Sequence, residues 1–426
     1  MNQNTSKGQD VVITGVGPVT SIGVGREACW RGLVGGRVQV TSRTLPVDLG
    51  RFVELPIAAM PASHEVPGLE AHMGYLAEQD CASARDLGYA LLAMELAIAD
   101  AQLDYDRDRN AIGMVQVFEA PGVERTVSEL FQLFAAGPPI DGPPHVYDLL
   151  AQRFYNMQPF LYVHLAGKAL GLRGFCTSVH NACSSGAFAL ETAAQCIRAG
   201  QADVMIVAGG EAFDTAVRLE WFRRLDLYAR MVPMRPFEPG PTGFYVGEGA
   251  GAIVLESAAH ARQRGVRSYA AYLGGAFAHQ GWKQTIPDVR AGRLRKVIAG
   301  ALVRTGVSLS ELDLVVPHGA ATAVSDKYEA ACLAGAFEGQ KTPAVAAVFK
   351  PQFGHMLASC GIIETIAAVL AMRQQTLPGG PNEAHEQSVL PIPLFTEQTS
   401  RPIRTMLKLA TGFTGHDAAL VFRKVD

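Results

Sequence analysis

The sequence lacks several patterns that would each place it in a specialised class of protein. It has no uninterrupted apolar run of about 18 residues, the length that a helix needs to cross a bilayer, and its N-terminus MNQNTSKGQD has no apolar segment typical of a secretory signal. Its seven cysteines are an odd number without a CxxC pair, which argues against a disulfide framework and a structural zinc site. We therefore expect a cytoplasmic protein with no membrane span and no metal site.

An excess of charge of one sign is also absent. Lys and Arg total 37 against 40 for Asp and Glu, so the net charge at pH 7 is −3. This balance gives no general attraction to nucleic acid or anionic lipid, so an electrostatic partner would need a local patch. Gly15 and Gly17 lack the third glycine of the dinucleotide fingerprint. We expect no nucleic-acid partner and no bound cofactor.

Apolar residues, in contrast, make up 48% of the 426 residues, which is enough to bury more than one hydrophobic core. Short apolar runs alternate with segments of helical periodicity, the pattern of an α/β protein whose sheet is covered by helices. In the first half, strands are predicted at 11–17, 111–118, 174–182 and 202–212, and helices at 83–103, 160–172 and 184–200.

The second half echoes the first. Residues 291–322 repeat the order of helix, loop and strand seen in 83–118. Residues 354–379 resemble 181–200, because in both segments small residues lead into a helix that carries ET and then AA. This repetition indicates an internal duplication. The two predicted α/β halves are residues 1–258 and residues 259–426.

Cys183 is the first candidate for chemistry. It stands in NACSSG, between the predicted strand 174–182 and the helix that follows. Backbone N–H groups and the positive dipole end at a helix start would stabilise a thiolate there, and the same N–H groups could hold an oxyanion. The alternative is a small buried cysteine without a chemical role.

Two of the eleven histidines follow predicted strands, where α/β folds place their sites: His318 after LDLVVP and His355 after AAVFKPQFG. With Cys183 they form a set that suits acyl transfer followed by carbanion chemistry. Lys350 is either an exposed lysine or a buried ammonium that orders this site. Glu329 belongs either to the same site or to a solvated helix start.

Arginines gather between residues 218 and 235, and Arg223 and Arg224 are adjacent within this cluster. Such a cluster is usually a solvated face. The alternative is a docking site for an acidic partner.

In this order, the motifs resemble those of the elongating β-ketoacyl synthases of the thiolase-fold superfamily, which work on acyl groups held by acyl carrier protein. NACSSG resembles the nucleophile motif, HGAAT with DKYE the first histidine motif, and KPQFGH the lysine–histidine motif. The resemblance runs from VVITGVG to GHDAALVF, and so covers nearly the whole chain.

The resemblance implies an α/β fold of five layers, α-β-α-β-α, with two duplicated halves, and a dimer as the working unit. It implies that Cys183 accepts an acyl group from the phosphopantetheine of a carrier protein. A malonyl thioester then decarboxylates, and His318 and His355 donate hydrogen bonds to the enolate. The carbanion attacks the acyl-cysteine in a decarboxylative Claisen condensation.

The resemblance also assigns supporting roles. The N–H groups of Cys183 and Phe413 would form the oxyanion hole, while Lys350 and Glu329 would organise the histidines. Further assignments are Thr322, Phe413 and Thr414 to substrate binding, with Thr322 at the phosphopantetheine arm, and Arg223 and Arg224 to carrier-protein docking.

Several positions depart from the family pattern, among them Pro351, Phe353 and three residues near the proposed site. Ala320 replaces a hydroxyl residue of the first histidine motif, Thr414 replaces a glycine of the C-terminal loop, and Asp417 replaces an asparagine. These departures indicate a specialised pathway, such as polyketide or specialised fatty-acid biosynthesis.

Other functions remain as alternatives. One is a non-condensing acyltransferase, although Cys360 lies in an apolar helix where a core role fits better than that of a second catalytic cysteine. Another is a chain-length-factor-like subunit, which usually lacks the nucleophile. The resemblance favours a homodimer and leaves open a heterodimer with a ketosynthase-like partner.

Overall fold

The computed structural model describes residues 10–48, 50–104, 111–135, 154–230, 232–240, 242–290, 292–339, 342–380 and 388–425. The sheet strands of its first half are β1 (Val11–Thr20), β2 (Gly23–Val24), β5 (Ile112–Val117), β6 (Cys176–Ser178), β7 (Val204–Glu211) and β8 (Gly249–Ser257). Those of the second half are β9 (Ala270–His279), β10 (Leu314–Val316), β11 (Val345–Ala346), β14 (Thr405–Gly412) and β15 (His416–Lys424). Two separate small pairs are β3 (Thr41–Asp48) with β4 (Arg51–Ile57), and β12 (Thr376–Leu377) with β13 (Thr399–Ser400).

The order of the strands shows the internal duplication directly. The sheet runs β11-β10-β14-β15-β9-β1-β8-β7-β5-β6, and β2 pairs with β1. Outward from the antiparallel pair β1–β9, each half has two antiparallel pairings followed by two parallel ones. The predicted fold class, an α/β fold of two duplicated halves, is therefore confirmed, while the boundary between residues 258 and 259 stays a prediction.

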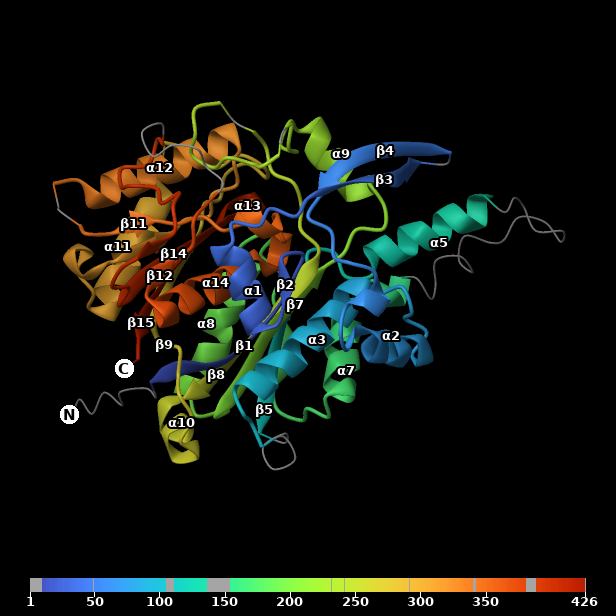
Figure 1. Cartoon of the computed structure of the whole chain (residues 1–426), viewed down its shortest axis with the longest axis horizontal. Coiled ribbons are helices and arrows are strands. Elements are labelled where there is room, and N and C mark those ends of the chain that lie inside the picture. Colours follow the sequence, from blue (N-terminus) through green and yellow to red (C-terminus); the bar gives the residue numbers. More distant parts are fainter. Residues whose placement is uncertain are drawn as a thin grey trace.

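Helices form the other layers. Those of the first half are α1 (Arg26–Val34), α2 (Leu69–Glu78), α3 (Arg85–Asp100), α5 (Val123–Ala135), α7 (Pro159–Ala169), α8 (Ser185–Arg198), α9 (Val217–Arg224) and α10 (Ala258–Arg264). Those of the second half are α11 (Arg293–Thr305), α12 (Ala323–Phe337), α13 (Lys350–Phe353) and α14 (Cys360–Gln374). Helices α8 and α14 pack against each other and against strands of both halves, while α3 covers the first half and α11 the second, as Figure 1 shows.

Helix α14 has the composition expected of its central place. It is buried on every side from Cys360 to Met372, and a helix that is apolar all round belongs in a core. Among the described residues, the segment Leu357–Gln374 is long and apolar enough to span a membrane, and 89% of it is buried inside the protein. Glu364 and Arg373 interrupt this segment, so the sequence shows no continuous apolar run.

Small residues allow the starts of α8 and α14 to meet. A Cβ on Gly361 would lie 2.7 Å from the backbone nitrogen of Ala187, and one on Gly186 would lie 2.9 Å from that of Ile362. These distances are shorter than a side chain tolerates. The two glycines therefore bring the helix that follows Cys183 against the helix that follows His355.

Two local predictions differ from the structure. The glycine-rich segment 243–257 has the composition of a strand–turn–strand unit, but only β8 forms, and the residues before it make isolated bridges such as Val246 with His355. The strand predicted at 174–182 is limited to Cys176–Ser178, because this edge strand pairs on one side with β5 and its residues are half-buried.

Candidate active site

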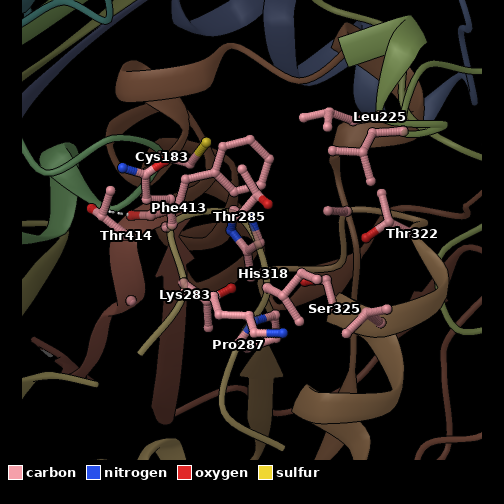
Figure 2. A pocket seen from close by; sticks show the side chains of 18 of the residues that line it. Cys183, Leu225, Lys283, Thr285, Pro287, His318, Thr322, Ser325, Phe413 and Thr414 are labelled. Carbon is pink, nitrogen blue, oxygen red and sulfur yellow. Dashed lines mark hydrogen bonds between the residues drawn. The ribbon is translucent and has the colours of Figure 1, made fainter. Parts of the chain in front are cut away.

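One cavity of about 240 Å³ collects the predicted catalytic side chains. Cys183 reaches it from the start of α8 in the first half, and His318 and His355 reach it from loops of the second half. Figure 2 shows Cys183 and Phe413 side by side on one wall, with His318 below them and Thr322 across the cavity. Three residues that are far apart in the sequence thus share one space.

The bend around Cys183 is held by its neighbours. Ala182 has a φ of 49°, a left-handed conformation that is uncommon for a residue with a side chain. The hydroxyl of Ser185 accepts from the N–H of Asn181 at 2.7 Å, and the hydroxyl of Ser184 donates to the carbonyl of His416 at 2.7 Å. These bonds tie the cysteine loop both to itself and to the C-terminal loop.

The protonation state of Cys183 reverses an expectation from the sequence. Burial raises the pKa of its thiol well above the ordinary value, the carboxylates of Glu119 and Glu211 add to this, and the Lys350 ammonium only partly opposes it. Helix α8 begins at Ser185, so the sulfur lies just before its first turn. The resting form is therefore the thiol, and not the thiolate that the helix start predicted.

The ring of His355 has a defined tautomer. Its Nδ1 accepts the backbone N–H of Leu357 at 3.2 Å and lies 2.9 Å from the sulfur of Cys360. Burial raises the pKa of the Cys360 thiol to about 12, so this thiol keeps a proton that it can donate to Nδ1. The proton of the neutral imidazole is consequently on Nε2, the nitrogen left for the cavity.

Charged groups hold the backbone of His318. Glu329 accepts the N–H of His318 at 2.5 Å and that of Gly319 at 2.9 Å, and the Lys350 ammonium donates to the carbonyl of His318. Both Glu329 and Lys350 are fully buried. The structure thus places them behind the histidine, which fits the positioning role predicted for them.

Two members of this charged cluster were missed in the sequence. Glu364 on α14 binds the Lys350 ammonium at 2.6 Å and the Lys408 ammonium at 2.7 Å. Lys408 lies on β14, where a single charged residue interrupts the apolar run of TMLKLATG. That interruption was the only signal, because nothing local shows that α14 carries its partner.

The lysines of this cluster lower the pKa of both imidazoles. Burial lowers the pKa of His318 and of His355 well below the ordinary value, and the ammoniums of Lys350 and Lys408 lower both further. Nδ1 of His318 is buried and has no hydrogen-bond partner among the described residues. Two neutral rings, one with an unused polar atom, therefore face the cavity.

The C-terminal loop forms another wall. Phe413 and Thr414 line the cavity, Thr414 has a φ of 63°, and its N–H donates to the carbonyl of Gln284 at 2.5 Å. Asp417, at the end of this loop, is buried and accepts from Tyr328 at 2.8 Å and from Gln280 at 2.9 Å. Burial raises the pKa of Asp417 to about 6, which these hydrogen bonds partly oppose. These hydrogen bonds therefore fix the carboxyl at the start of β15, next to the loop that lines the cavity.

The predicted contacts of the substrate arm and the carrier protein lie at different places. Thr322 and Ala320 line the cavity itself. Arg223 and Arg224 lie on the surface of α9, where both form ion pairs with Glu220. Phe222 and Leu225, which come just before and just after the two arginines, line the cavity, so this end of α9 lies next to it.

Aromatic rings that the sequence did not single out surround Cys183. Phe222 and Phe244 line the cavity, their ring centroids are 5.2 Å apart, and Phe244 lies 4.9 Å from the ring of His355. Trp221 reaches the ring of Phe413 at 5.8 Å. The sulfur is therefore enclosed by apolar surface, which is the physical cause of its raised pKa.

Comparison with known proteins agrees with this geometry. The model of the beta-ketoacyl synthase N-terminal domain matches residues 8–261, and that of the C-terminal domain matches residues 269–383. The 3-oxoacyl-[acyl-carrier-protein] synthase 2 of Rhizobium meliloti (strain 1021) is 28% identical, over 97% of this chain and 98% of the relative.

Two solved structures share the fold. The ishigamide ketosynthase/chain length factor has a TM-score of 0.81 at 24% identity, over 98% of this chain and 100% of that one. A type II PKS acyl-carrier protein in complex with its ketosynthase bound to the hexaketide also gives 0.81 at 24% identity, over 99% of this chain and 100% of that one. Both likenesses concern the fold.

Proposed function

Since this chain belongs to the β-ketoacyl synthase family, whose members are acyltransferases that form carbon–carbon bonds, we propose that it catalyses a decarboxylative Claisen condensation. The observation that carries the proposal is the meeting of Cys183, His318 and His355 in one cavity. A thiol and two neutral imidazoles supply a nucleophile and two N–H donors, which are the groups that the reaction needs.

The first step is acyl transfer. The sulfur of Cys183 attacks the carbonyl carbon of an acyl thioester, loses its proton, and releases the phosphopantetheine thiol of the carrier protein. Because the thiol is protonated at rest, removal of this proton belongs to the step. His355 carries its proton on the nitrogen that faces the cavity, so we assign the thiol proton to the neutral His318, which passes it to the sulfur of the leaving phosphopantetheine.

The second step is decarboxylation. A malonyl-type thioester loses CO₂, and the electron pair of the broken bond forms an enolate on the thioester. We assign the N–H donors for its oxygen to His318 and His355. Their neutral state supports this assignment, because an imidazolium would pair with the malonyl carboxylate and stabilise the group that has to leave.

The third step forms the new bond. The enolate carbon attacks the acyl carbon on Cys183, and the resulting oxyanion is assigned to the N–H groups of Cys183 and Phe413. Both residues line the cavity and lie side by side in Figure 2. Collapse of this intermediate expels the cysteine sulfur and leaves a β-ketoacyl chain on the carrier. Loss of one such donor typically costs about 100- to 1000-fold in rate.

We assign the carrier protein to the face beside the cavity mouth. Arg223 and Arg224 offer exposed positive charge there, and Thr322, Phe413 and Thr414 line the route for a phosphopantetheine arm. The relatives support this, since one is named for an acyl-carrier-protein substrate and a structural neighbour is a ketosynthase with its carrier protein. No bound cofactor is needed, because the substrates arrive on that arm.

The pathway is proposed from the departures at Ala320, Thr414 and Asp417, which support polyketide or specialised fatty-acid synthesis. The location is proposed to be the cytoplasm, where the seven free cysteines would stay reduced.

A heterodimer with a ketosynthase-like partner is the second candidate for the working unit. One structural neighbour is a ketosynthase/chain length factor. The present chain would be the catalytic subunit of such a pair, because it has the cysteine nucleophile in the cavity.

The test separates the steps with three variants. Cys183→Ala should take up no acyl group from an acyl carrier protein, as measured by intact mass. His318→Ala and His355→Ala should still be acylated, but should release CO₂ from a malonyl carrier thioester at least about 100-fold more slowly than the parent.

Acylation of Cys183→Ala on another cysteine would reject the nucleophile. Condensation near the parent rate in either histidine variant would reject the enolate role. Acylation of the parent without any carbon–carbon bond formation would favour a non-condensing acyltransferase.

A further inference from the structure

A second buried lysine stands behind the active site. The Lys408 ammonium is fully buried and forms an ion pair with Glu364 at 2.7 Å. It donates hydrogen bonds to the carbonyl of Leu409 at 2.6 Å and to the carbonyl of Pro317 at 3.5 Å. A buried ammonium is costly unless it is paired and hydrogen-bonded, as this one is. None of the steps assigned above uses this residue.

The acceptors of Lys408 relate it to His318. The carbonyl of Pro317 belongs to the peptide before His318, and the N–H of that peptide is bound by Glu329. The peptide after His318 is held in the same way, since its carbonyl accepts from Lys350 and its N–H donates to Glu329. In each of the two peptides that flank the α-carbon of His318, the carbonyl and the N–H therefore both form a hydrogen bond with a side chain of this cluster.

The charges of this cluster balance. Lys350 and Lys408 share the carboxylate of Glu364, and Glu329 is the second carboxylate. Removal of Lys408 would leave two carboxylates with one ammonium directly behind the imidazoles. The positive charge that opposes protonation of His318 and His355 would then be weaker.

We propose that Lys408 is a positioning residue for His318, which fixes the peptide before it and, together with Lys350, keeps both imidazoles neutral. The proposal depends on the proposed function only for the expected effect of Lys408 on the rate of CO₂ release. The placement of the histidine and its charge state are properties of the protein without substrate.

The groups that face the two imidazoles come from every neighbouring element. They are Cys360, whose sulfur lies 2.9 Å from Nδ1 of His355, Cys183 in the same cavity, Lys350 on α13, Lys408 on β14, Glu364 on α14, and Asp326 and Glu329 on α12. The two histidine rings also face each other, with their centroids 5.5 Å apart.

The sign of the expected shift follows from these charges. Burial, Lys350 and Lys408 all lower the pKa of His318 and His355, while the carboxylate of Glu364 pairs with both lysines. Without Lys408, the pKa of both rings should rise. The acid limb of the decarboxylation rate should therefore move to higher pH, because more imidazolium is present at a given pH.

The test uses Lys408→Met and Lys408→Gln in the full chain. Met removes the charge and the donors, whereas Gln keeps two N–H donors without the charge. Met406→Ala is the matched control, because Met406 is also fully buried on β14 but carries no charge. The readouts are imidazole titration by NMR with ¹⁵N-histidine, acylation of Cys183 by intact mass, and CO₂ release from a malonyl carrier thioester.

We expect both Lys408 variants to titrate His318 and His355 at higher pH than the parent. CO₂ release at pH 7 should fall on the order of 10-fold or more, as for other small displacements of a catalytic group, while acylation of Cys183 changes much less. Met406→Ala should lower the melting temperature and leave both titrations in place.

Three outcomes would overturn the proposal. One is a Lys408 variant with the parent's titrations and rates. Another is an equal loss of acylation and CO₂ release with unmoved titrations, which is what a general loss of stability would produce. The third applies if Lys408→Met does not fold. The same measurements are then made on Lys408→Gln, and titrations of His318 and His355 that match the parent in this variant would reject the proposal.

A parent protein that releases no CO₂ would instead reject the proposed condensation. The titrations need no substrate, so in that case they alone would decide whether Lys408 keeps the imidazoles neutral.

Discussion

Cys183 shows a competition between two effects on one residue. A helix start favours a thiolate, whereas an apolar enclosure favours the thiol. Phe222, Phe244 and Phe413 provide that enclosure, and the buried Lys350 ammonium is directed at Glu364 and the backbone of His318. Burial therefore decides the resting state of the sulfur.

This state predicts the pH dependence of alkylation. Because the pKa of Cys183 is raised, the thiolate fraction is small at pH 7 and grows as the pH rises towards that pKa. The rate of Cys183 alkylation by iodoacetamide should still be increasing above about pH 9, where a free cysteine with a pKa of about 8.5 has nearly reached its plateau. Peptide mass mapping would measure it.

The control for this experiment is the same protein in denaturant, where Cys183 should follow the free-cysteine curve. A native plateau reached below pH 7 would contradict the thiol resting state and restore the thiolate predicted from the helix start.

At the scale of elements, helix α9 combines exposed positive charge with a position next to the cavity. The side chains of Arg223 and Arg224 are 56% and 72% exposed, so both are accessible although Glu220 pairs with them. Trp221, on the same helix, contacts Phe413 of the C-terminal loop. A partner that docks on α9 would thus lie next to the cavity, because Phe222 of this helix and Phe413 both line it.

Charge reversal on α9 should separate docking from chemistry. For Arg223→Glu with Arg224→Glu, we expect the KM for an acyl carrier protein to rise about 10-fold or more, because rim charges govern encounter with an acidic partner. The rate with a small acyl thioester should stay unchanged. Steady-state kinetics with both donors would measure this.

The matched control reverses Arg262 and Arg267, which are exposed at and just beyond α10, at the opposite end of the molecule from α9 in Figure 1. This control should leave both donors unaffected. An equal loss on both donors in the α9 variant would refute the docking role.

At the scale of the whole molecule, one edge of the sheet has no further strand beside it in the part of the chain that the structure describes. Strand β6 ends the sheet, and apolar side chains beside it are exposed: Phe154, Tyr155, Phe160 and Phe175, at 48% to 65%. A strand edge of this kind, with exposed aromatic rings beside it, favours association with a second chain. This edge supports the proposal that the chain works as a dimer.

A measurement of the oligomeric state tests the proposal that the chain forms a dimer through this edge. The 45.4 kDa chain should sediment at twice its mass in analytical ultracentrifugation. Phe160→Asp with Phe175→Asp should shift it to the monomer, because each aspartate would be desolvated in the interface. Val303→Asp, at an exposed site on α11, should not.

A parent chain that sediments as a monomer would contradict the homodimer. Recovery of condensation only after addition of a similar second chain would then favour the heterodimer.

Much of the site was predictable because its motifs are local. NACSSG and HGAAT each place a reactive residue shortly after a strand, and the repeated pattern of strands and helices indicated two halves. His355 of KPQFGH was predicted to follow a strand as well, but it follows the short helix α13. Periodicity and composition act over a few residues, so one sequence is sufficient to read them.

The tertiary structure alone decided what depends on packing. It placed Lys408 against Glu364 and the backbone before His318, and it enclosed Cys183 in aromatic rings that raise its pKa. The sequence by itself determined which groups are available and the order of elements that carries them. Their partners and protonation states come from the folded molecule, because burial and electrostatic contact join residues that lie far apart along the chain.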